Sequence, residues 1–413
     1  MSGGAANIVP VAEPIAETAA PPIYSLRQMT AYALRLGALG FGGPVALVGY
    51  MHRDLVEQRK WISEADYKEG LTLAQLMPGP LAAQLAMYMG YVHYGVAGAT
   101  LVGIAFVLPS FLMVLALGWA YVTYGGLAWM QSVFYGVGAS VIGIILLSAI
   151  KLTRKTIGKD WLLWLIYLGS AAVTVVTESE MITLFLGAGI LFWLIRTPPS
   201  FRPRPEGNTA ALLPIIPASG LSVLTDSSQW PVLAQIFVFF TKAGAFVFGS
   251  GLAIVPFLYS GVVKEYGWLN DHEFLDAVAV AMITPGPVVI TVGFIGYIVA
   301  GLPGACVAAL GTFLPCYLFT IIPAPYFKKH GKRPGIVAFV EGVTAAAIGA
   351  IAGAVVVLGR RTIFGDGYTP DIPKVILLAA TIGLLWKFKK LPEPVIVLGA
   401  ALIGVVVYPL VSH

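Results

Sequence analysis

The sequence predicts an all-α, polytopic membrane protein. Of its 413 residues, 58% are hydrophobic and only 11% are charged, and the mean hydropathy is +0.85. A soluble domain carries roughly 25% charged residues, so this chain lacks the polar side chains that a water-exposed surface needs. Its 47 glycines and 28 prolines fit the same class, because transmembrane helices tolerate both. We interpret the net charge of +5 as basic loops that orient the spans, and not as nucleic-acid binding.

A spanning helix needs roughly 17–25 mostly apolar residues, and about twelve segments approach that length. The polar stretch 1–24 is expected to be a disordered tail, and 196–230, rich in proline, glycine and serine, a linker between a first membrane domain (25–195) and a second one (231–413). The apolar segments are 27–51, 70–92, 96–122, 127–150, 161–177 and 181–195 in the first domain, and 232–260, 274–299, 302–323, 335–358, 373–386 and 394–411 in the second.

The two domains are related by an internal repeat, with a shift of 207 residues that becomes 206 after one deletion. Duplicated membrane domains of this kind are typical of secondary transporters. The aligned pairs include Gly37 with Gly244, Trp61 with Trp268, Pro78-Gly79-Pro80 with Pro285-Gly286-Pro287, Gly90 with Gly296, and Arg154 with Arg360.

The basic loops favour an inverted relation between the repeats. A basic cluster at 151–159 follows the fourth apolar segment of the first domain, whereas the densest cluster of the second domain, at 328–333, follows its third segment. Cytoplasmic loops are enriched in lysine and arginine. A shift of the basic loop by one span therefore indicates that the two domains have opposite orientations.

Two glycine-rich segments, at 36–44 and 243–251, occupy equivalent positions in the repeats. Glycines at this density loosen a helix and expose backbone N–H groups, which bind anions at a helix start. The alternative is tight helix packing through small residues. The duplication favours a binding role, for which the candidate residues are Gly42, Gly43, Gly249 and Ser250.

The two Pro-Gly-Pro motifs predict broken or re-entrant helices. Proline removes a backbone donor and clashes with the preceding turn, yet both motifs lie inside apolar segments. Non-helical backbone at that depth is tolerated only beside protein or a watery cavity, and in transporters it marks the substrate site. A simple kink is the alternative. Gln84 and Thr291, a few residues further along, are candidates to donate hydrogen bonds to a substrate.

Few charged residues lie inside the apolar segments. Arg35 and Lys242 are equivalent in the repeat. Because a base near the bilayer centre is energetically costly, we predict that the pair has a function, which is to attract an oxyanion. The alternative is that both side chains snorkel to the membrane interface. Glu69 and Asp276 are also equivalent and are candidates for proton coupling, as is Glu341. The alternative is that these acids only mark the starts of helices at the membrane interface.

The sequence contains no signature of an enzyme. It has no phosphate-binding loop of the ATPase type, no nucleophile elbow and no zinc-protease motif. The two cysteines and five histidines show no metal-ligand spacing. We therefore expect neither a cofactor nor a metal.

The segments Phe41-Gly-Gly-Pro-Val-Ala-Leu-Val-Gly-Tyr-Met-His-Arg-Asp54, 61–67 and Leu76-Met-Pro-Gly-Pro80 resemble the chromate ion transporter family. In the second domain, Phe248-Gly-Ser-Gly and Ile283-Thr-Pro-Gly-Pro287 are similar to the other half of that family, although Ser250-Gly251 stands where the first domain has Gly43-Pro44. The resemblance covers about residues 25–360.

The resemblance implies a long, two-domain bacterial transporter that exports chromate across the inner membrane and so confers chromate resistance. Sulfate is a related oxyanion and remains an alternative substrate, and a membrane-embedded enzyme or sensor is a more distant one. The expected partners are chromate and the lipid bilayer. The sequence leaves the oligomeric state open, a homodimer included.

Overall fold

The computed structural model describes residues 24–40, 43–124, 128–177, 182–198, 231–246, 254–330, 333–364, 369–388 and 393–411. The described residues contain helices and no strands, as the composition predicts. Most of the predicted tail (1–24) and most of the predicted linker (196–230) lie outside them.

The first repeat begins with two helical hairpins that enter the molecule and return to the same end. Helix α1 (Leu26–Leu39) is followed by α2 (Gly43–Met51) and the π-helical turn η1 (His52–Gln58), and α3 (Glu64–Leu76) is followed by the first part of α4 (Leu81–Tyr124). Tyr24, just before α1, stacks on Trp61 at 4.9 Å, and its hydroxyl lies 2.7 Å from His93 Nδ1 in α4. Both hairpins therefore start and end together, at what we call the Trp61 end.

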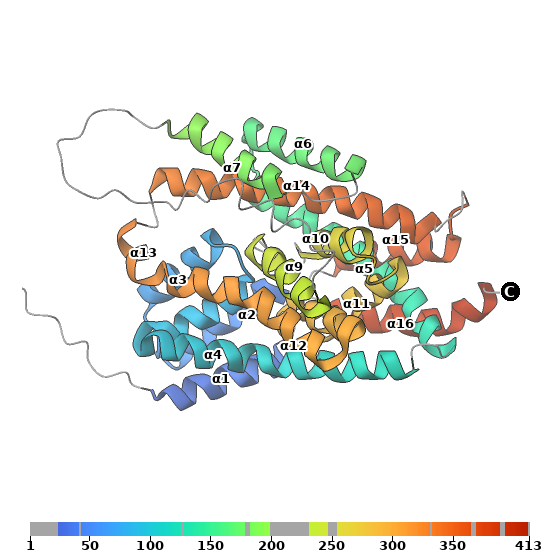
Figure 1. Cartoon of the computed structure of the whole chain (residues 1–413), viewed down its shortest axis with the longest axis horizontal. Coiled ribbons are helices and arrows are strands. Elements are labelled where there is room, and N and C mark those ends of the chain that lie inside the picture. The colour runs from blue at the N-terminus through green and yellow to red at the C-terminus, as the bar shows by residue number, and fades with distance from the viewer. Residues whose placement is uncertain are drawn as a thin grey trace, which may run out of the picture.

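Helix α4 reverses direction at Gly95. This residue has φ 57° and ψ −148°, a conformation that only glycine adopts readily. On either side of the turn, Gly90 and Gly98 pack so closely that a Cβ on either one would overlap the carbonyl of the other. The longer second part of α4 then runs along most of the molecule (Figure 1).

The second repeat has the same sequence of elements, starting from the opposite end. It comprises α9 (Val232–Phe246), α10 (Ile254–Tyr259), the π-helical turn η3 (Ser260–Glu265), α11 (Asp271–Ile283), η4 (Val288–Ile290) and α12 (Thr291–Ile321), which reverses at Gly301. Phe240 of α9 stacks on Trp268, which follows η3. We call this second pole the Trp268 end.

Contacts between α4 and α12 show that the two repeats are inverted. Thr100, near the Trp61 end of α4, has its hydroxyl 2.6 Å from that of Tyr317, near the end of α12. Gly118, further along α4, packs against Tyr297, near the start of α12. Tyr297 precedes the reversal of α12 at Gly301, and its neighbour Gly296 packs on Gly304 just after the turn. Gly118 therefore lies beside the start of the second part of α12 and Thr100 beside its end, so the two long helix parts are antiparallel. The inverted arrangement predicted from the basic loops is confirmed.

The later helices are exchanged between the repeats. In the first repeat these are α5 (Ala128–Thr156), α6 (Trp161–Thr177) and α7 (Ile182–Arg196), and in the second they are α14 (Pro334–Phe364), α15 (Ile372–Lys387) and α16 (Glu393–Val411), preceded by the short α13 (Ala324–His330). Helices α6 and α7 pack on α14, and α15 and α16 pack on α5. The two repeats therefore interlock and share one core.

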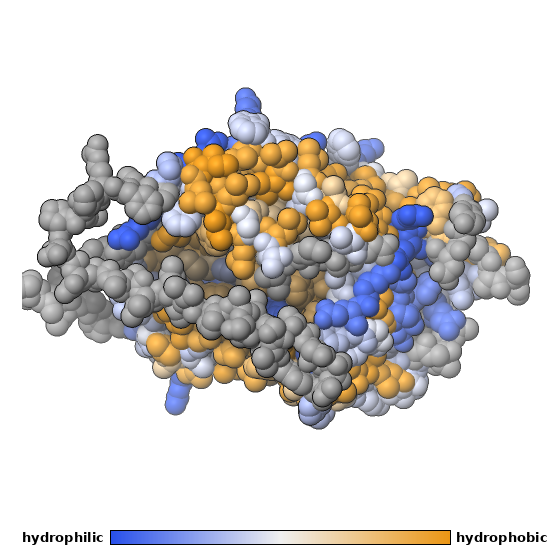
Figure 2. All heavy atoms as spheres, turned by 45° about the horizontal axis from the view of Figure 1, so that its top comes forward, coloured by the Kyte–Doolittle hydropathy of each residue, from blue (hydrophilic) through white to orange (hydrophobic). Residues whose placement is uncertain are grey.

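The surface suits a lipid environment. Among the described residues, α4, α5, α14 and the continuous segment Val288–Phe327 are long and apolar enough to cross a bilayer, and four shorter apolar helices accompany them. Large hydrophobic side chains such as Leu101, Trp161 and Leu402 are exposed along them, and Figure 2 shows broad hydrophobic areas over the body of one face. The chain is a multi-pass membrane protein.

Candidate functional site

The first Pro-Gly-Pro motif interrupts the chain between α3 and α4. Helix α3 ends at Leu76, α4 begins at Leu81, and Gly79 between them has φ 141°. The fully buried side chain of Gln84 donates from Nε2 to the carbonyl of Pro78 at 2.7 Å, which holds the turn, while its Oε1 has no partner. The predicted break is confirmed, and it forms the tip of a re-entrant hairpin.

The second motif forms the equivalent tip and contacts the first repeat directly. Helix α11 ends at Ile283, and Gly286 has φ 91°. The N–H of Gly286 donates to the carbonyl of Gly40, at the inner end of α1, at 3.0 Å. Ser110 of α4 donates to the carbonyl of Pro285 at 2.7 Å. The broken helices of opposite repeats therefore meet inside the molecule.

Cys316 stands at the repeat position of Ser110 and completes this pseudo-symmetry. Its Sγ lies against Gly79, at 3.2 Å from the position of a Cβ there. Each Pro-Gly-Pro tip is thus held by the long transmembrane helix of the other repeat. A movement of one repeat relative to the other would alter both tips together.

The tips place helix starts in the middle of the protein. Helices α2 and α4 begin there, as does the 3-10 turn η4, which runs directly into α12. The first turn of a helix has backbone N–H groups without intrahelical partners. Such groups, together with the helix dipole, attract anions. The first residues of α4, Leu81, Ala82 and Ala83, are buried, so an anion here would be shielded from bulk water. The same tips carry the carbonyl ends of α1, α3 and α11, which suit a proton or a cation.

The other predicted binding residues are distributed unevenly. Arg35 is exposed on α1, whereas Lys242 is half-buried on α9, so the two bases have different surroundings. Thr291 is fully buried and donates to the carbonyl of Val288 at 2.7 Å. Gly43 opens α2. Three further predicted residues, Gly42, Gly249 and Ser250, lie outside the described part of the chain. The role of all these residues in binding stays a prediction.

The three candidate acids also differ. Glu69 accepts a hydrogen bond at 2.8 Å from Tyr88, within its own hairpin. Asp276 is 9% exposed and accepts a bond at 2.9 Å from Tyr121 of α4, in the opposite repeat. Glu341 is exposed on α14. Asp276 is therefore the acid whose hydrogen bond would change if the repeats moved apart.

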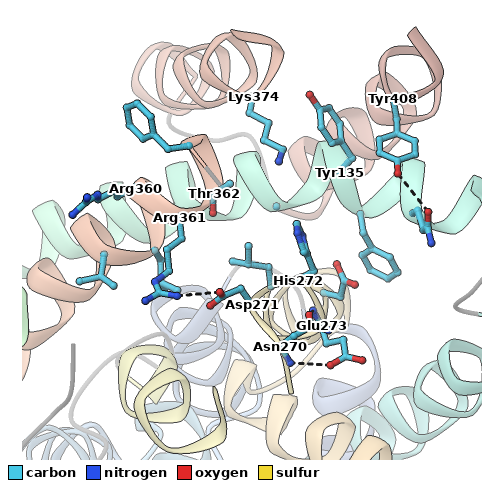
Figure 3. Close-up of a pocket in the computed structure, with 18 of the residues that line it drawn as sticks. Tyr135, Asn270, Asp271, His272, Glu273, Arg360, Arg361, Thr362, Lys374 and Tyr408 are labelled. Atoms are coloured by element: carbon cyan, nitrogen blue, oxygen red, sulfur yellow. Dashed lines mark hydrogen bonds and ion pairs between the residues drawn. The ribbon is translucent and has the colours of Figure 1, made fainter. Parts of the chain in front are cut away.

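A cavity of about 1170 Å³ opens beside α11 at the Trp268 end (Figure 3). Asp276 and Tyr121 line it, and a separate, smaller apolar cavity of about 130 Å³, lined by Tyr121 and Ile283, lies further along α11. Sequence reasoning missed the basic residues of the larger cavity, Arg360, Arg361 and Lys374. The alignment of Arg154 with Arg360 pointed to this region, but such bases also serve to orient spans.

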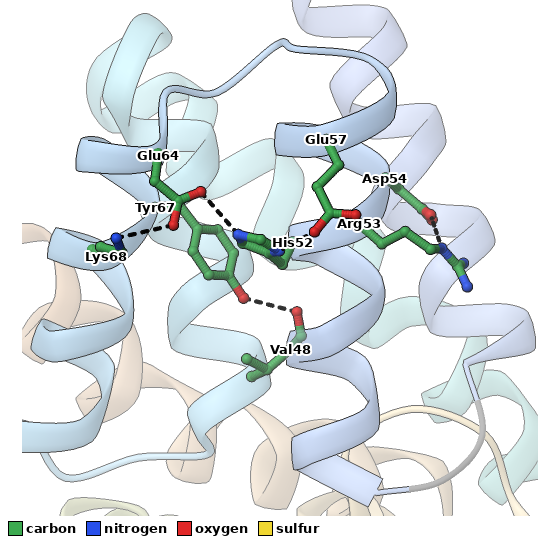
Figure 4. Close-up of polar contacts among 8 residues, drawn as sticks. All are labelled: Val48, His52, Arg53, Asp54, Glu57, Glu64, Tyr67 and Lys68. Carbon is green, nitrogen blue, oxygen red and sulfur yellow. Dashed lines mark hydrogen bonds and ion pairs between the residues drawn. The ribbon is translucent and has the colours of Figure 1, made fainter.

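A polar cluster at the Trp61 end fixes the turn between the two hairpins of the first repeat (Figure 4). His52 lies 2.9 Å from Glu64 and 3.1 Å from Glu57, and Lys68 lies 3.2 Å from Glu64. The hydrogen bond from His52, followed by that from Lys68, lowers the pKa of Glu64. Tyr67 donates to the carbonyl of Val48 at 2.8 Å. These contacts link η1 and α2 to α3, and we assign them a structural role.

Within the described ranges, no cluster of histidine, cysteine, aspartate or glutamate has the geometry of a metal site. The observed arrangement instead combines an inverted repeat, helix breaks that meet in the core and a cavity beside α11, the helix that ends at one of these breaks. This combination is typical of membrane transporters.

Comparison with known proteins identifies the family. The family model described as "Chromate transporter" matches residues 27–193 and 234–405, one region in each repeat. The chain belongs to the chromate transporter family. It is 70% identical over 392 residues to a chromate transport protein of Cupriavidus metallidurans, covering 95% of this chain and 96% of the relative.

Two further relatives extend the comparison. A probable chromate transport protein of Synechococcus elongatus is 64% identical over 387 residues, covering 93% of this chain and 96% of the relative. A chromate transport protein of Pseudomonas aeruginosa is 30% identical over 405 residues, covering 95% and 94%. No solved structure matches the chain. These relatives are transport proteins, so this chain is a transporter and not an enzyme.

Proposed function

We propose that this protein exports chromate from the cytoplasm across the bacterial inner membrane and thereby confers chromate resistance. The observation that carries the proposal is the meeting of buried helix starts at the two Pro-Gly-Pro tips, in a chain whose relatives are named for chromate transport. A tetrahedral dianion would bind there between backbone N–H groups, with Arg35 and Lys242 adding attraction. Sulfate has the same shape and charge and is the alternative substrate.

The distribution of basic residues supports a cytoplasmic Trp61 end. Loops with many lysines and arginines stay in the cytoplasm. The Trp268 end contains Lys264, Arg360, Arg361 and Lys374, whereas the Trp61 end contains Arg27, Arg53, Arg59, Lys60, Lys68, Lys151, Arg154, Lys155, Lys159, Arg196, Lys328, Lys329, Arg333 and Lys387. In this orientation the large cavity opens to the periplasm, on the release side for an exporter.

The membrane potential is a sufficient driving force for export. Moving one charge through 100 mV corresponds to about 2.3 kcal/mol, so a dianion leaving an inside-negative cell gains about 4.6 kcal/mol. At about 1.4 kcal/mol per factor of ten, this sustains a gradient on the order of a thousandfold. Proton coupling would add to it, and Asp276 is its best-placed candidate because it is buried beside the cavity and bonded to the opposite repeat.

Uptake of chromate into everted membrane vesicles tests the proposal. We expect uptake that depends on an imposed potential and that excess sulfate reduces. Arg35→Gln and Lys242→Gln should each lower it at unchanged expression. Full uptake in both variants would remove the two bases from the site, and no uptake by the wild type would refute chromate export.

Reporter fusions test the orientation independently. Fusions after residues 60 and 330 should report a cytoplasmic location, and fusions after 265 and 361 a periplasmic one. The reverse pattern would place the cavity on the cytoplasmic side and would reverse the assignment of the release side.

A further inference from the structure

The wall of the large cavity at the Trp268 end combines basic side chains with a buried hydroxyl. Arg361 and Thr362 lie near the end of α14, and Lys374 lies in the first turn of α15. Figure 3 shows Thr362 between Arg361 and Lys374 on this wall. None of these residues belongs to the Pro-Gly-Pro tips.

Both cations are oriented by carboxylates that tyrosines hold in place. Arg361 Nη1 lies 3.0 Å from Asp271, which also accepts a bond from Tyr259 at 2.6 Å. Lys374 Nζ lies 3.5 Å from Asp371, which accepts a bond from the Tyr135 hydroxyl at 2.6 Å. A guanidinium has five N–H donors and an ammonium three, so both groups can bind an anion as well as a carboxylate.

Thr362 is the observation that points to a ligand. The residue lines the cavity with a side chain that is only 6% exposed, and its hydroxyl oxygen is buried and has no hydrogen-bond partner. Leaving a buried hydroxyl unpaired destabilises a protein, and native structures contain few such groups. A donor set of hydroxyl, ammonium and guanidinium suits an acceptor with several negatively charged oxygens.

We propose that Arg361, Lys374 and Thr362 form a second oxyanion subsite, which takes a tetrahedral dianion such as chromate or sulfate on its way out of the protein. The inference rests on the proposed export function. Helix α11 starts beside this subsite and ends at the second Pro-Gly-Pro tip, so the helical rise of roughly 1.5 Å per residue separates the two by about 20 Å. Asp271 and Asp371 partly neutralise the cations, which keeps binding weak enough for release.

Sulfate binding to the purified full chain tests the subsite, because sulfate does not oxidise thiols as chromate does. We expect Lys374→Gln to raise the sulfate dissociation constant roughly tenfold, the usual effect of losing one charge-assisted hydrogen bond. Thr362→Val should raise it severalfold while leaving the melting temperature of the sulfate-free protein unchanged or higher, since no partner loses a bond. A purely structural threonine would not change sulfate affinity.

Arg360→Gln is the matched control. Arg360 precedes Arg361 on the same helix and also lines the cavity, but Figure 3 places it away from Thr362 and Lys374, so its loss should change sulfate affinity far less than that of Lys374. If Lys374→Gln and Thr362→Val both bind sulfate like the wild type, the subsite is refuted while chromate uptake by the wild type still supports export. If the wild type transports neither anion, the export function itself fails.

Discussion

Gly286 offers a sharp test of how the two repeats meet. It has φ 91°, and its N–H donates to the carbonyl of Gly40 in the opposite repeat. A Cβ at this position would overlap the hydroxyl oxygen of Ser110 and approach the Gly37 carbonyl at 3.3 Å. Gly286→Ala therefore opposes the observed contact between the second Pro-Gly-Pro tip and the first repeat.

The cost of Gly286→Ala has two parts. An alanine at positive φ costs about 1–2 kcal/mol. In addition, Ser110 must rotate away and lose its 2.7 Å bond to the carbonyl of Pro285, which costs about 1 kcal/mol and more if that carbonyl stays buried and unpaired. Gly267 provides the matched control, because it has φ 59° but a Cβ added there would meet no atom within 4 Å.

Chromate uptake and thermal melting of the two variants measure this difference. We expect Gly267→Ala to lower the melting temperature slightly and to keep uptake, and Gly286→Ala to lower both further, with uptake reduced at least tenfold. Ser110→Ala in the Gly286→Ala background should recover part of the loss. Equal behaviour of Gly286→Ala and Gly267→Ala would show that the tip does not pack on the first repeat during transport.

Three other outcomes are expected. Asp276→Asn should retain potential-driven uptake but remove any stimulation by a pH gradient, and retained stimulation would exclude this acid as the coupling group. Gly90→Ala places a Cβ onto the carbonyl of Gly98 and should destabilise the protein by about 2 kcal/mol or more. The melting temperature should therefore fall, and an unchanged melting temperature would contradict the tight packing of the α4 hairpin. The pKa of Glu64 is lowered in the fold by its hydrogen bond with His52, so this bond stabilises the folded protein at neutral pH and is lost as the carboxylate is protonated. The melting temperatures of the wild type and His52→Ala should therefore converge below about pH 4.

Much of the architecture could be predicted from patterns that are visible in the sequence. The shift of about 207 residues reveals the duplication, and two prolines around a glycine cannot continue a helix, so both tips were predictable. The basic loops around 151–159 and 328–333 indicated inversion because charge placement depends on the membrane side and not on packing.

The path of the chain at the helix breaks was less predictable. The segments 27–51 and 70–92 each read as one apolar span with an interruption, but the structure folds each back to the Trp61 end. Hydropathy is the same for a kinked span and a re-entrant hairpin, and contacts such as that of Tyr24 with Trp61 decide between them. The exchange of α6 and α7 with α15 and α16 is likewise a matter of packing.

The candidate site was predictable only where the backbone itself forms it. The Pro-Gly-Pro tips were found because their chemistry is encoded locally. Arg35 and Lys242 share a repeat position, but their burial depends on neighbours that only the fold supplies, and it differs between them. Thr362 and Lys374 were missed, since nothing in the sequence places the end of α14 beside the start of α11.

The most direct test is a cryo-electron microscopy structure of the protein in lipid nanodiscs with and without chromate. The proposal predicts extra density at the meeting Pro-Gly-Pro tips, within hydrogen-bond distance of the first N–H groups of α4 or η4, that disappears when chromate is left out. Density that avoids the tips, or tips that straighten into continuous helices, would contradict it.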